Sequence, residues 1–258
     1  MKPDSIKKSV IEVSDLGLSY GNRTVLQEVS FDVMKGSCLA VMGASGCGKS
    51  TLLKGMTGLL KPFNGKVKFE GDSMWGDGQL PHDEVLSKFG VLFQGGALWS
   101  SMNLLENISL PLDTFSRLNR QEIEDMAAYK LSLVGLSGCE FLYPSELSGG
   151  MQKRAGLARA LAMDPEILFL DEPSAGLDPI NSNQLDELIL ELKDSLGITF
   201  VVVTHELDSI FSISDHSIFL SNQSKTIIDQ GKPIDLLKGS RLEEVRDFLG
   251  RSSRINSK

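Results

Sequence analysis

The sequence predicts an α/β fold in which a mixed β-sheet core carries an antiparallel β-subdomain near the N-terminus and a helical insertion. Three observations predict it. Short strand-like runs separated by turns fill the first part of the chain. An apolar strand then leads through a glycine-rich loop into a helix, and two nearly continuous apolar runs later flank an amphipathic helix. The chain of 258 residues is long enough to bury a sizeable core.

The composition excludes several classes of protein. Hydrophobic residues make up 41% of the chain and charged residues 23%, which is typical of a globular protein and not of a disordered or collagen-like one. No apolar run approaches the roughly 18 to 20 residues that a membrane-spanning helix requires. The polar residues 1–10 do not predict a secretory signal. Three cysteines fit a reducing compartment, and a net charge of -8 argues against general nucleic-acid binding. We therefore expect a cytosolic protein with no nucleic-acid partner.

The β-subdomain is predicted from alternating apolar residues near the N-terminus. Strands are expected at Ile11–Val13, at Leu16–Tyr20 and over residues 29–33, where Val, Phe and Val alternate with polar residues. Gly21-Asn22 and Lys35-Gly36 are the predicted turns.

A strand, a loop and a helix follow in the order that a phosphate-binding motif requires. Cys38–Met42 is a short apolar strand, and leucine and methionine recur at helical spacing over residues 52–60 until Pro62 stops the helix. Between them, Gly43–Ser50 fits the pattern G-x-x-x-x-G-K-[ST]. A chance glycine-rich turn is the alternative, but these flanks favour a phosphate site.

The chemistry of this loop follows from its residue types. Glycines let backbone N–H groups surround a phosphate, and the helix N-terminus adds a positive dipole end. Lys49 would neutralise the β and γ phosphates, and the Ser50 hydroxyl would bind Mg²⁺. Cys47 lies inside the loop at a helix N-terminus, where the pKa of a thiol can be lowered. Alkylation of Cys47 would then block the site, and bound nucleotide would protect it.

The rest of the chain completes the α/β pattern. Residues from about 95 to 165 are mainly helical, and Asn119 with Glu122 predicts a capping box. Buried strands are expected at Ile167–Leu170 and Ile198–Thr204, with an amphipathic helix between them. The C-terminal part predicts a hairpin of strands at 217–220 and 226–228, a helix over 242–249, and a disordered polar tail over 251–258.

Two acidic residues end the strand at Ile167–Leu170. Asp171 would lie at the carboxyl edge of the sheet, where open α/β sheets bind ligands, and would hold Mg²⁺ directly or through water. Glu172 would orient and polarise an attacking water. An acidic strand end that caps a turn is the alternative, and the phosphate loop upstream favours the catalytic role.

Leu147–Met151, LSGGM, together with Lys153-Arg154 and Leu157–Ala160, resembles the signature sequence of ABC-type ATPases. The resemblance covers Val10 to Pro233. It implies a P-loop NTPase fold of ABC type, with ATP and Mg²⁺ as cofactors. It also implies a homodimer, because the signature segment of one protomer completes the ATP site of the other.

Smaller motifs match the same family position by position. Tyr20 matches the aromatic residue that stacks on adenine, and Gln94 matches the glutamine that touches Mg²⁺ and water. His205 matches the histidine that contacts the γ-phosphate, and Ser174–Asp178 matches the loop that joins two protomers. The resemblance thus implies that Glu172, His205 and Lys49 are catalytic and that Ser50, Gln94 and Asp171 bind the metal. The implied ATP-binding residues are Tyr20, Gly43, Ala44, Ser45, Gly46, Cys47, Gly48, Lys49, Ser50, Thr51, Gln94, Ser148, Gly149, Gly150 and His205.

The family's organisation can be carried onto this chain. An ABC ATPase domain is expected over residues 10–233, with a core from 10–94 and 166–233 and a helical subdomain over 95–165. Residues 234–258 would form a C-terminal helix and a polar tail. With one ATPase unit and no membrane span, the chain would need separate integral-membrane permease subunits, and it would lie peripherally at the cytoplasmic side of the inner membrane.

Within the family, the chain is most similar to ATPases of the phospholipid-transport system that maintains outer-membrane lipid asymmetry (Mla) with MCE proteins. The similarity rests on residues 91–99, VLFQGGALW, on 102–108, MNLLENI, and on Pro111-Leu112. Met151 and the ending RDFLG over 246–250 agree with it. The region after Gln94 forms, in the family, the groove that grips a coupling helix of the permease. The expected function is therefore ATP-driven phospholipid transport between the inner and outer membranes, with a permease and an MCE-type lipid-binding protein.

Two other functions fit the same motifs. An importer ATPase for small solutes such as amino acids shares every catalytic motif. A non-transport ABC ATPase of iron-sulfur assembly or DNA maintenance is the third hypothesis, and the short helical insertion argues against the DNA-repair relatives. An inactive subunit is disfavoured because Lys49, Asp171, Glu172 and His205 are all present.

Overall fold

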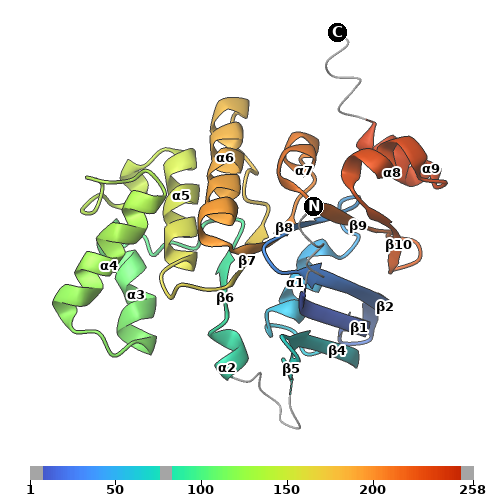
Figure 1. Cartoon of the computed structure of the whole chain (residues 1–258), viewed down its shortest axis with the longest axis horizontal. Coiled ribbons are helices and arrows are strands. Elements are labelled where there is room, and N and C mark those ends of the chain that lie inside the picture. Colours follow the sequence, from blue (N-terminus) through green and yellow to red (C-terminus); the bar gives the residue numbers. More distant parts are fainter. Residues whose placement is uncertain (1–7, 76–82, 251–258) are drawn as a thin grey trace, which may run out of the picture.

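The computed structural model describes residues 8–75 and 83–250, and their strands form two sheets (Figure 1). The smaller sheet is antiparallel. Its order is β2 (Arg23–Met34), β1 (Ser9–Tyr20), β4 (Asn64–Phe69) and β5 (Asp72–Ser73). This confirms the predicted β-subdomain, although β2 is longer than the strand expected over residues 29–33 and β4 and β5 were not predicted. The two strands predicted on either side of Asp15 form one strand, because Asp15 takes a left-handed conformation (φ 48°) that shifts the register without ending the pairing.

The larger sheet is mixed and provides the core. Its order is β10 (Ile227–Gly231), β9 (His216–Leu220), β3 (Cys38–Met42), β8 (Thr199–Val203), β7 (Ile167–Asp171) and β6 (Phe89–Leu92). All neighbours are parallel except the hairpin of β9 and β10, which the sequence predicted. Every residue of β3 and β8 is buried, as apolar strands covered on both faces require. The carboxyl ends of the parallel strands therefore meet at one edge around β3.

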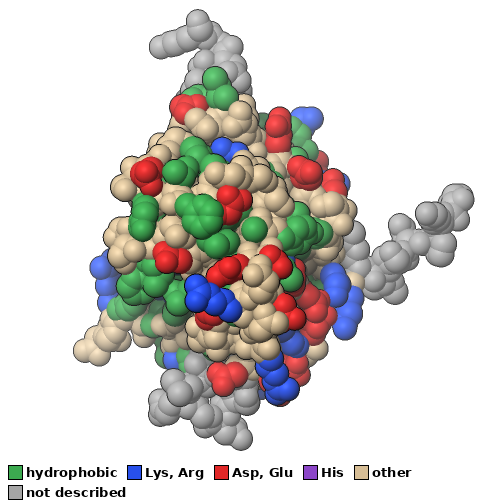
Figure 2. Space-filling view, turned by 90° about the vertical axis from the view of Figure 1, so that its left-hand side faces the viewer, with side chains coloured by type: hydrophobic (Ala, Val, Ile, Leu, Met, Phe, Trp, Pro, Cys, Tyr) green, Lys and Arg blue, Asp and Glu red, His purple; other side chains and the backbone are tan. Residues whose placement is uncertain are grey.

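A cluster of helices lies beside the larger sheet, and its outer face is turned to the viewer in Figure 2. It contains α3 (Leu104–Phe115), α4 (Arg120–Leu133) and α5 (Gly149–Ala160). The predicted capping box of Asn119 and Glu122 begins α4, and a second one formed by Asn103 and Glu106 begins α3. Apolar residues of the three helices share one core with β7 and β8. These helices fall within residues 95–165, and the bounds of a helical subdomain stay a prediction.

Helix α1 (Lys49–Met56) is shorter than the sequence predicted. The helix ends one turn before Leu60, although apolar spacing continues to that residue. The hydroxyl of Thr57 donates to the Leu53 carbonyl at 2.9 Å, and Gly58 takes a left-handed conformation with φ 76°. A left-handed glycine ends a helix readily, so the chain turns before it reaches Pro62.

Of the remaining α-helices, one lies between β5 and β6, and the others lie between or after strands β7 to β10. These are α2 (Asp83–Leu86), α6 (Pro179–Leu196), α7 (Leu207–Ile213), α8 (Pro233–Gly239) and α9 (Glu243–Leu249). The predicted amphipathic helix is α6, and the predicted C-terminal helix is α9; the polar tail after it lies outside the described residues. None of the helices in residues 8–75 and 83–250 is both long and apolar enough to cross a membrane.

Candidate functional site

The loop between β3 and α1 curls around an open space at the carboxyl edge of the sheet. Gly43 and Gly48 have φ values of 146° and 105°, which favour glycine. A Cβ atom on Gly43 would lie 2.4 Å from the carbonyl oxygen of Leu220, so a larger residue would push the loop off β9. The loop ends at the N-terminus of α1, where backbone N–H groups and the helix dipole favour an anion.

Lys49 places a cation inside this loop. Its side chain is buried, and its Nζ donates to the carbonyl oxygens of Gly43 at 2.9 Å and Ala44 at 3.3 Å. These bonds hold the ammonium over the loop. The loop therefore combines a fixed positive charge with backbone donors, which is the chemistry that phosphate groups require.

Two oxygen-bearing side chains meet beside the loop. The hydroxyl of Ser50 donates to Oδ1 of Asp171 at 3.1 Å. Burial raises the pKa of the Asp171 carboxyl, although the hydrogen bond from Ser50 acts in the opposite direction. Hydroxyl and carboxylate oxygens are the donors that Mg²⁺ prefers, so this pair fits the metal that the sequence analysis implied.

Glu172 faces the same space from the end of β7. Its backbone is left-handed, with φ 50°, and its N–H donates to the carbonyl of Val203 at 2.8 Å. One carboxylate oxygen, Oε1, lies 2.8 Å from Nδ1 of His205, while the other, Oε2, is buried without a hydrogen-bond partner. The contact with His205 thus holds the Glu172 carboxylate in one orientation at the wall of the pocket.

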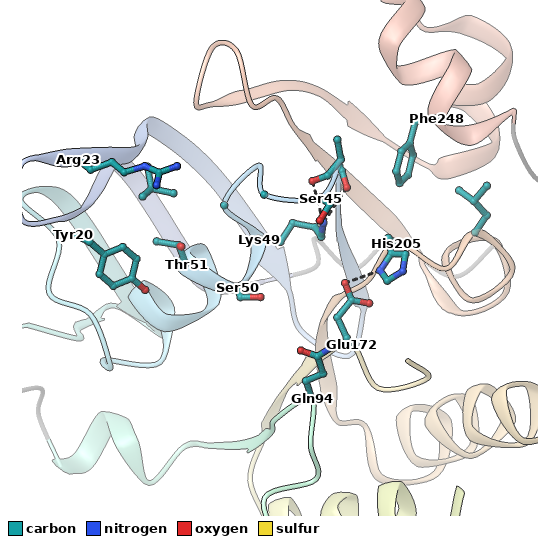
Figure 3. A pocket seen from close by; sticks show the side chains of 16 residues that line it. Tyr20, Arg23, Ser45, Lys49, Ser50, Thr51, Gln94, Glu172, His205 and Phe248 are labelled. Atoms are coloured by element: carbon teal, nitrogen blue, oxygen red, sulfur yellow. Dashed lines mark hydrogen bonds and ion pairs between the residues drawn. The ribbon is translucent and has the colours of Figure 1, made fainter. Parts of the chain in front are cut away.

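A pocket of about 740 Å³ joins these groups. In Figure 3, Tyr20 and Arg23 lie at one end of the pocket, and His205 and Phe248 lie at the other. The predicted site residues that line it are Tyr20, Gly43, Ala44, Ser45, Gly46, Gly48, Lys49, Ser50, Thr51, Gln94, Glu172 and His205. Residues from five separate parts of the chain thus converge, while their roles stay predictions.

The side chain of Cys47 points away from the pocket. It is 2% exposed and packs in the core, and burial raises the pKa of the thiol. The expectation of a lowered pKa was therefore wrong, because removal of the thiolate from water outweighs the helix N-terminus and the charge of Lys49. Cys47 contributes its backbone to the loop.

The signature segment also lies outside the pocket of its own chain. The Ser148 hydroxyl accepts a hydrogen bond from the Met151 N–H at 3.3 Å and caps α5, and Gly149 and Gly150 form the first turn. A Cβ atom on Gly150 would lie 2.7 Å from Oδ1 of Asn181. This placement is compatible with the expectation that the segment completes a partner's site.

Sequence reasoning missed five residues at the site. Arg23, Val25, Leu207 and Phe248 line the pocket, and Lys153 reaches two carbonyl oxygens beneath it. Arg23 follows the predicted turn at Gly21-Asn22, and Leu207 lies two residues after His205. Their closeness in sequence to predicted site residues was a weak indication that they line the pocket. Nothing in the local sequence indicates that Phe248 of α9 reaches a loop about 200 residues earlier.

The chain matches a family model and several curated proteins over most of its length. A model described as ABC transporter matches residues 26–175. The intermembrane phospholipid transport system ATP-binding protein MlaF of Haemophilus influenzae is 36% identical, over 96% of this chain and 93% of that protein. MlaF of Escherichia coli (strain K12) is 37% identical, over 93% of this chain and 88% of that protein. A Mycobacterium leprae protein named "Probable ribonucleotide transport ATP-binding protein mkl" is 38% identical, over 93% and 68%.

Solved structures share the fold as well. The cbiO1 protein of Clostridium perfringens, described as part of the ABC transporter complex cbiONQ, has a TM-score of 0.82 at 27% identity, over 97% of this chain and 98% of that one. The ATP-binding cassette MJ0796, solved as a dimer in a post-hydrolysis state bound to ADP and Pi, has a TM-score of 0.76 at 29% identity, over 86% and 98%.

Proposed function

The chain belongs to the ABC transporter family and is an ABC ATPase that hydrolyses ATP, and we propose that it drives phospholipid transport between the inner and outer membranes. The observation that carries the proposal is the similarity to MlaF proteins over more than nine-tenths of this chain. The segment around residues 91–112, on which the sequence resemblance rests, lies in this same span.

The proposed roles of the site residues combine their positions around the pocket with the roles that the family resemblance implies. Tyr20 stacks on the adenine, and the loop with Lys49 holds the phosphates. Ser50 and Asp171 hold Mg²⁺, which would neutralise charge on the β and γ phosphates when bound. Glu172 orients the attacking water through its carboxylate. His205 fixes one oxygen of that carboxylate and contacts the γ-phosphate.

We further propose that two copies of the chain form each pair of ATP sites. The signature residues Ser148, Gly149 and Gly150 do not line the pocket of their own chain. Their backbone N–H groups begin a helix and can approach a γ-phosphate bound by another copy. The dimeric state of the similar cassette MJ0796 supports this arrangement.

The helical face that Figure 2 shows is the proposed docking site for a permease, which would hold the chain at the cytoplasmic side of the inner membrane. A groove of about 710 Å³ runs between α3 and α4. Met102, Leu105 and Leu110 provide apolar lining, while Glu106 and Asp113 provide acidic groups. This lining suits a short helix with an apolar face and basic residues beside it.

Import of a small solute is the second candidate function. It is favoured by the similarity to mkl, which is named for ribonucleotide transport and is as similar to this chain as MlaF is. The two candidates share the ATPase site, so only the partners and the cargo separate them.

The test is to purify the tagged full-length chain from solubilised membranes of its own organism. Phospholipid transport predicts that a permease and an MCE-domain protein co-purify, and that the complex in liposomes moves labelled phospholipid only with ATP. A solute-binding protein in place of the MCE protein, with no phospholipid movement, would instead establish the importer.

A further inference from the structure

One ammonium group joins two loops that enter the ATP pocket. Nζ of Lys153, on α5, donates to the carbonyl oxygen of Gln94 and, at 3.2 Å, to that of Glu172. The Lys153 side chain is buried, with 8% exposed. A buried ammonium needs acceptors for its three donors, so these two carbonyls fix where it lies. Lys153 therefore links the loop after β6 to the loop after β7.

The contact with Glu172 acts on a backbone that most residues avoid. Glu172 has a φ of 50°, which side chains other than glycine rarely adopt. Its N–H is held by Val203 of β8, and its carbonyl accepts from the Ala175 N–H at 3.2 Å as well as from Lys153. Lys153 thus helps to hold the conformation that directs the Glu172 carboxylate toward His205.

The contact with Gln94 belongs to a wider attachment of its loop to α5. Arg159, six residues after Lys153, donates to the carbonyl of Ala97, which is left-handed with φ 52°. A Cβ atom on Gly156 would lie 2.9 Å from the carbonyl oxygen of Gly96, so helix and loop are in close contact. The loop is therefore attached to α5 through both Lys153 and Arg159.

We propose that Lys153 is a positioning residue for ATP hydrolysis. Its hydrogen bonds couple the position of α5 to the positions of Gln94 and Glu172. The inference rests on the role proposed for Glu172 and on the contact with Mg²⁺ and water that the family resemblance implies for Gln94. It adds that α5, which begins with the signature segment, helps to position Glu172 of the same chain. The link between them is the hydrogen bond from Lys153 to the Glu172 carbonyl. Lys153 itself would touch neither ATP nor water.

The test compares Lys153→Met with Lys153→Arg in the full-length chain. Methionine fills similar space but donates no hydrogen bond, so kcat for ATP hydrolysis should fall about tenfold or more, while KM for ATP stays within about threefold. Arginine keeps N–H donors and should recover a large part of kcat. Hydrogen exchange should quicken over residues 94–97 and 172–175 in Lys153→Met alone.

Lys130→Met is the matched control. Lys130 is also a buried lysine, 2% exposed, and it pairs with Asp164, which lies before β7, whereas Glu172 follows the other end of that strand. Its loss should leave kcat unchanged. If Lys153→Met turned over ATP like the wild type, or slowed only with general unfolding of α5, the inference would be wrong.

Glu172→Gln separates this failure from failure of the proposed site. If the Glu172→Gln variant is inactive and the Lys153→Met variant is fully active, only the role of Lys153 is rejected and the proposed site stands. Full turnover by Glu172→Gln would reject the site assignment and with it the inference.

Discussion

Glu172 and His205 form a hydrogen-bonded pair across the ends of two strands, with Oε1 and Nδ1 2.8 Å apart. The pair unites two residues that the sequence analysis had assigned separately, one to water activation and one to phosphate contact. The contact with His205 therefore fixes the orientation of the Glu172 carboxylate at the wall of the pocket.

Glu172→Gln is expected to lower kcat for ATP hydrolysis by about 100-fold or more, because an amide cannot accept a proton from water. ATP binding should persist and the dimer should accumulate. Phosphate release at saturating ATP and size-exclusion chromatography measure the two effects. Glu206→Gln is the control, since Glu206 lies 3.6 Å from the other ring nitrogen of His205 and is half exposed. Equal losses in both variants would contradict the assignment.

Iodoacetamide at pH 7.5 should modify Cys139 before Cys47. Cys139 is partly exposed, whereas Cys47 is buried with a raised thiol pKa and therefore little thiolate at that pH. Cys38, also buried with a raised pKa, should react slowly too. Peptide mass spectrometry over a time course gives the order of labelling. Preferential labelling of Cys47 would mean that the loop opens in solution.

Asp186 should make stability fall as pH rises. Burial against α7 raises its pKa to about 6, and the charge of Asp208 adds to the shift. The folded state therefore favours the protonated acid, so folding loses stability as pH rises from about 4 through 6. Asp186→Asn should stabilise the protein by up to about 3 kcal/mol at pH 8 and by less at pH 5.5. Urea unfolding at the two pH values tests this, with the exposed Asp194→Asn as control.

Phe248→Ala should weaken ATP binding through loss of an apolar wall. The Phe248 ring packs edge-on against Phe219 with centroids 5.3 Å apart and lines the pocket. KM for ATP should rise several-fold, and stability should fall by roughly 3 kcal/mol. Phe211→Ala is the matched control, because Phe211 packs in the same cluster without lining the pocket. An unchanged KM in Phe248→Ala would limit α9 to a structural role.

The sequence predicted the parts of the site that lie within single segments. The strand, loop and helix around Lys49 form one local unit, and the acidic end of β7 is visible as a change from apolar to charged residues. The capping box of Asn119 is equally local. Each of these depends on contacts within a few residues, which pattern and propensity describe well.

Contacts between distant segments escaped prediction for a physical reason. Lys153 and Gln94 are 59 residues apart, and their bond depends on the angle at which α5 crosses β6. The short helices α7 and α8 were also not predicted, whereas α9, which has the same length of seven residues, was predicted from its apolar face. Helix α1 ends earlier than predicted because Gly58 takes a left-handed conformation. The apolar spacing used to predict the helix does not indicate that conformation.

The central place of β3 has a consequence for how the protein is made. Its neighbours in the sheet are β8 and β9, which follow it by more than 150 residues. Until those strands leave the ribosome, β3 has two unpaired edges, and Gly43 lacks the strand against which its loop packs. Contacts of such long sequence separation form late. We therefore expect the loop to bind nucleotide only after β8 and β9 have paired with β3, late in synthesis of the chain.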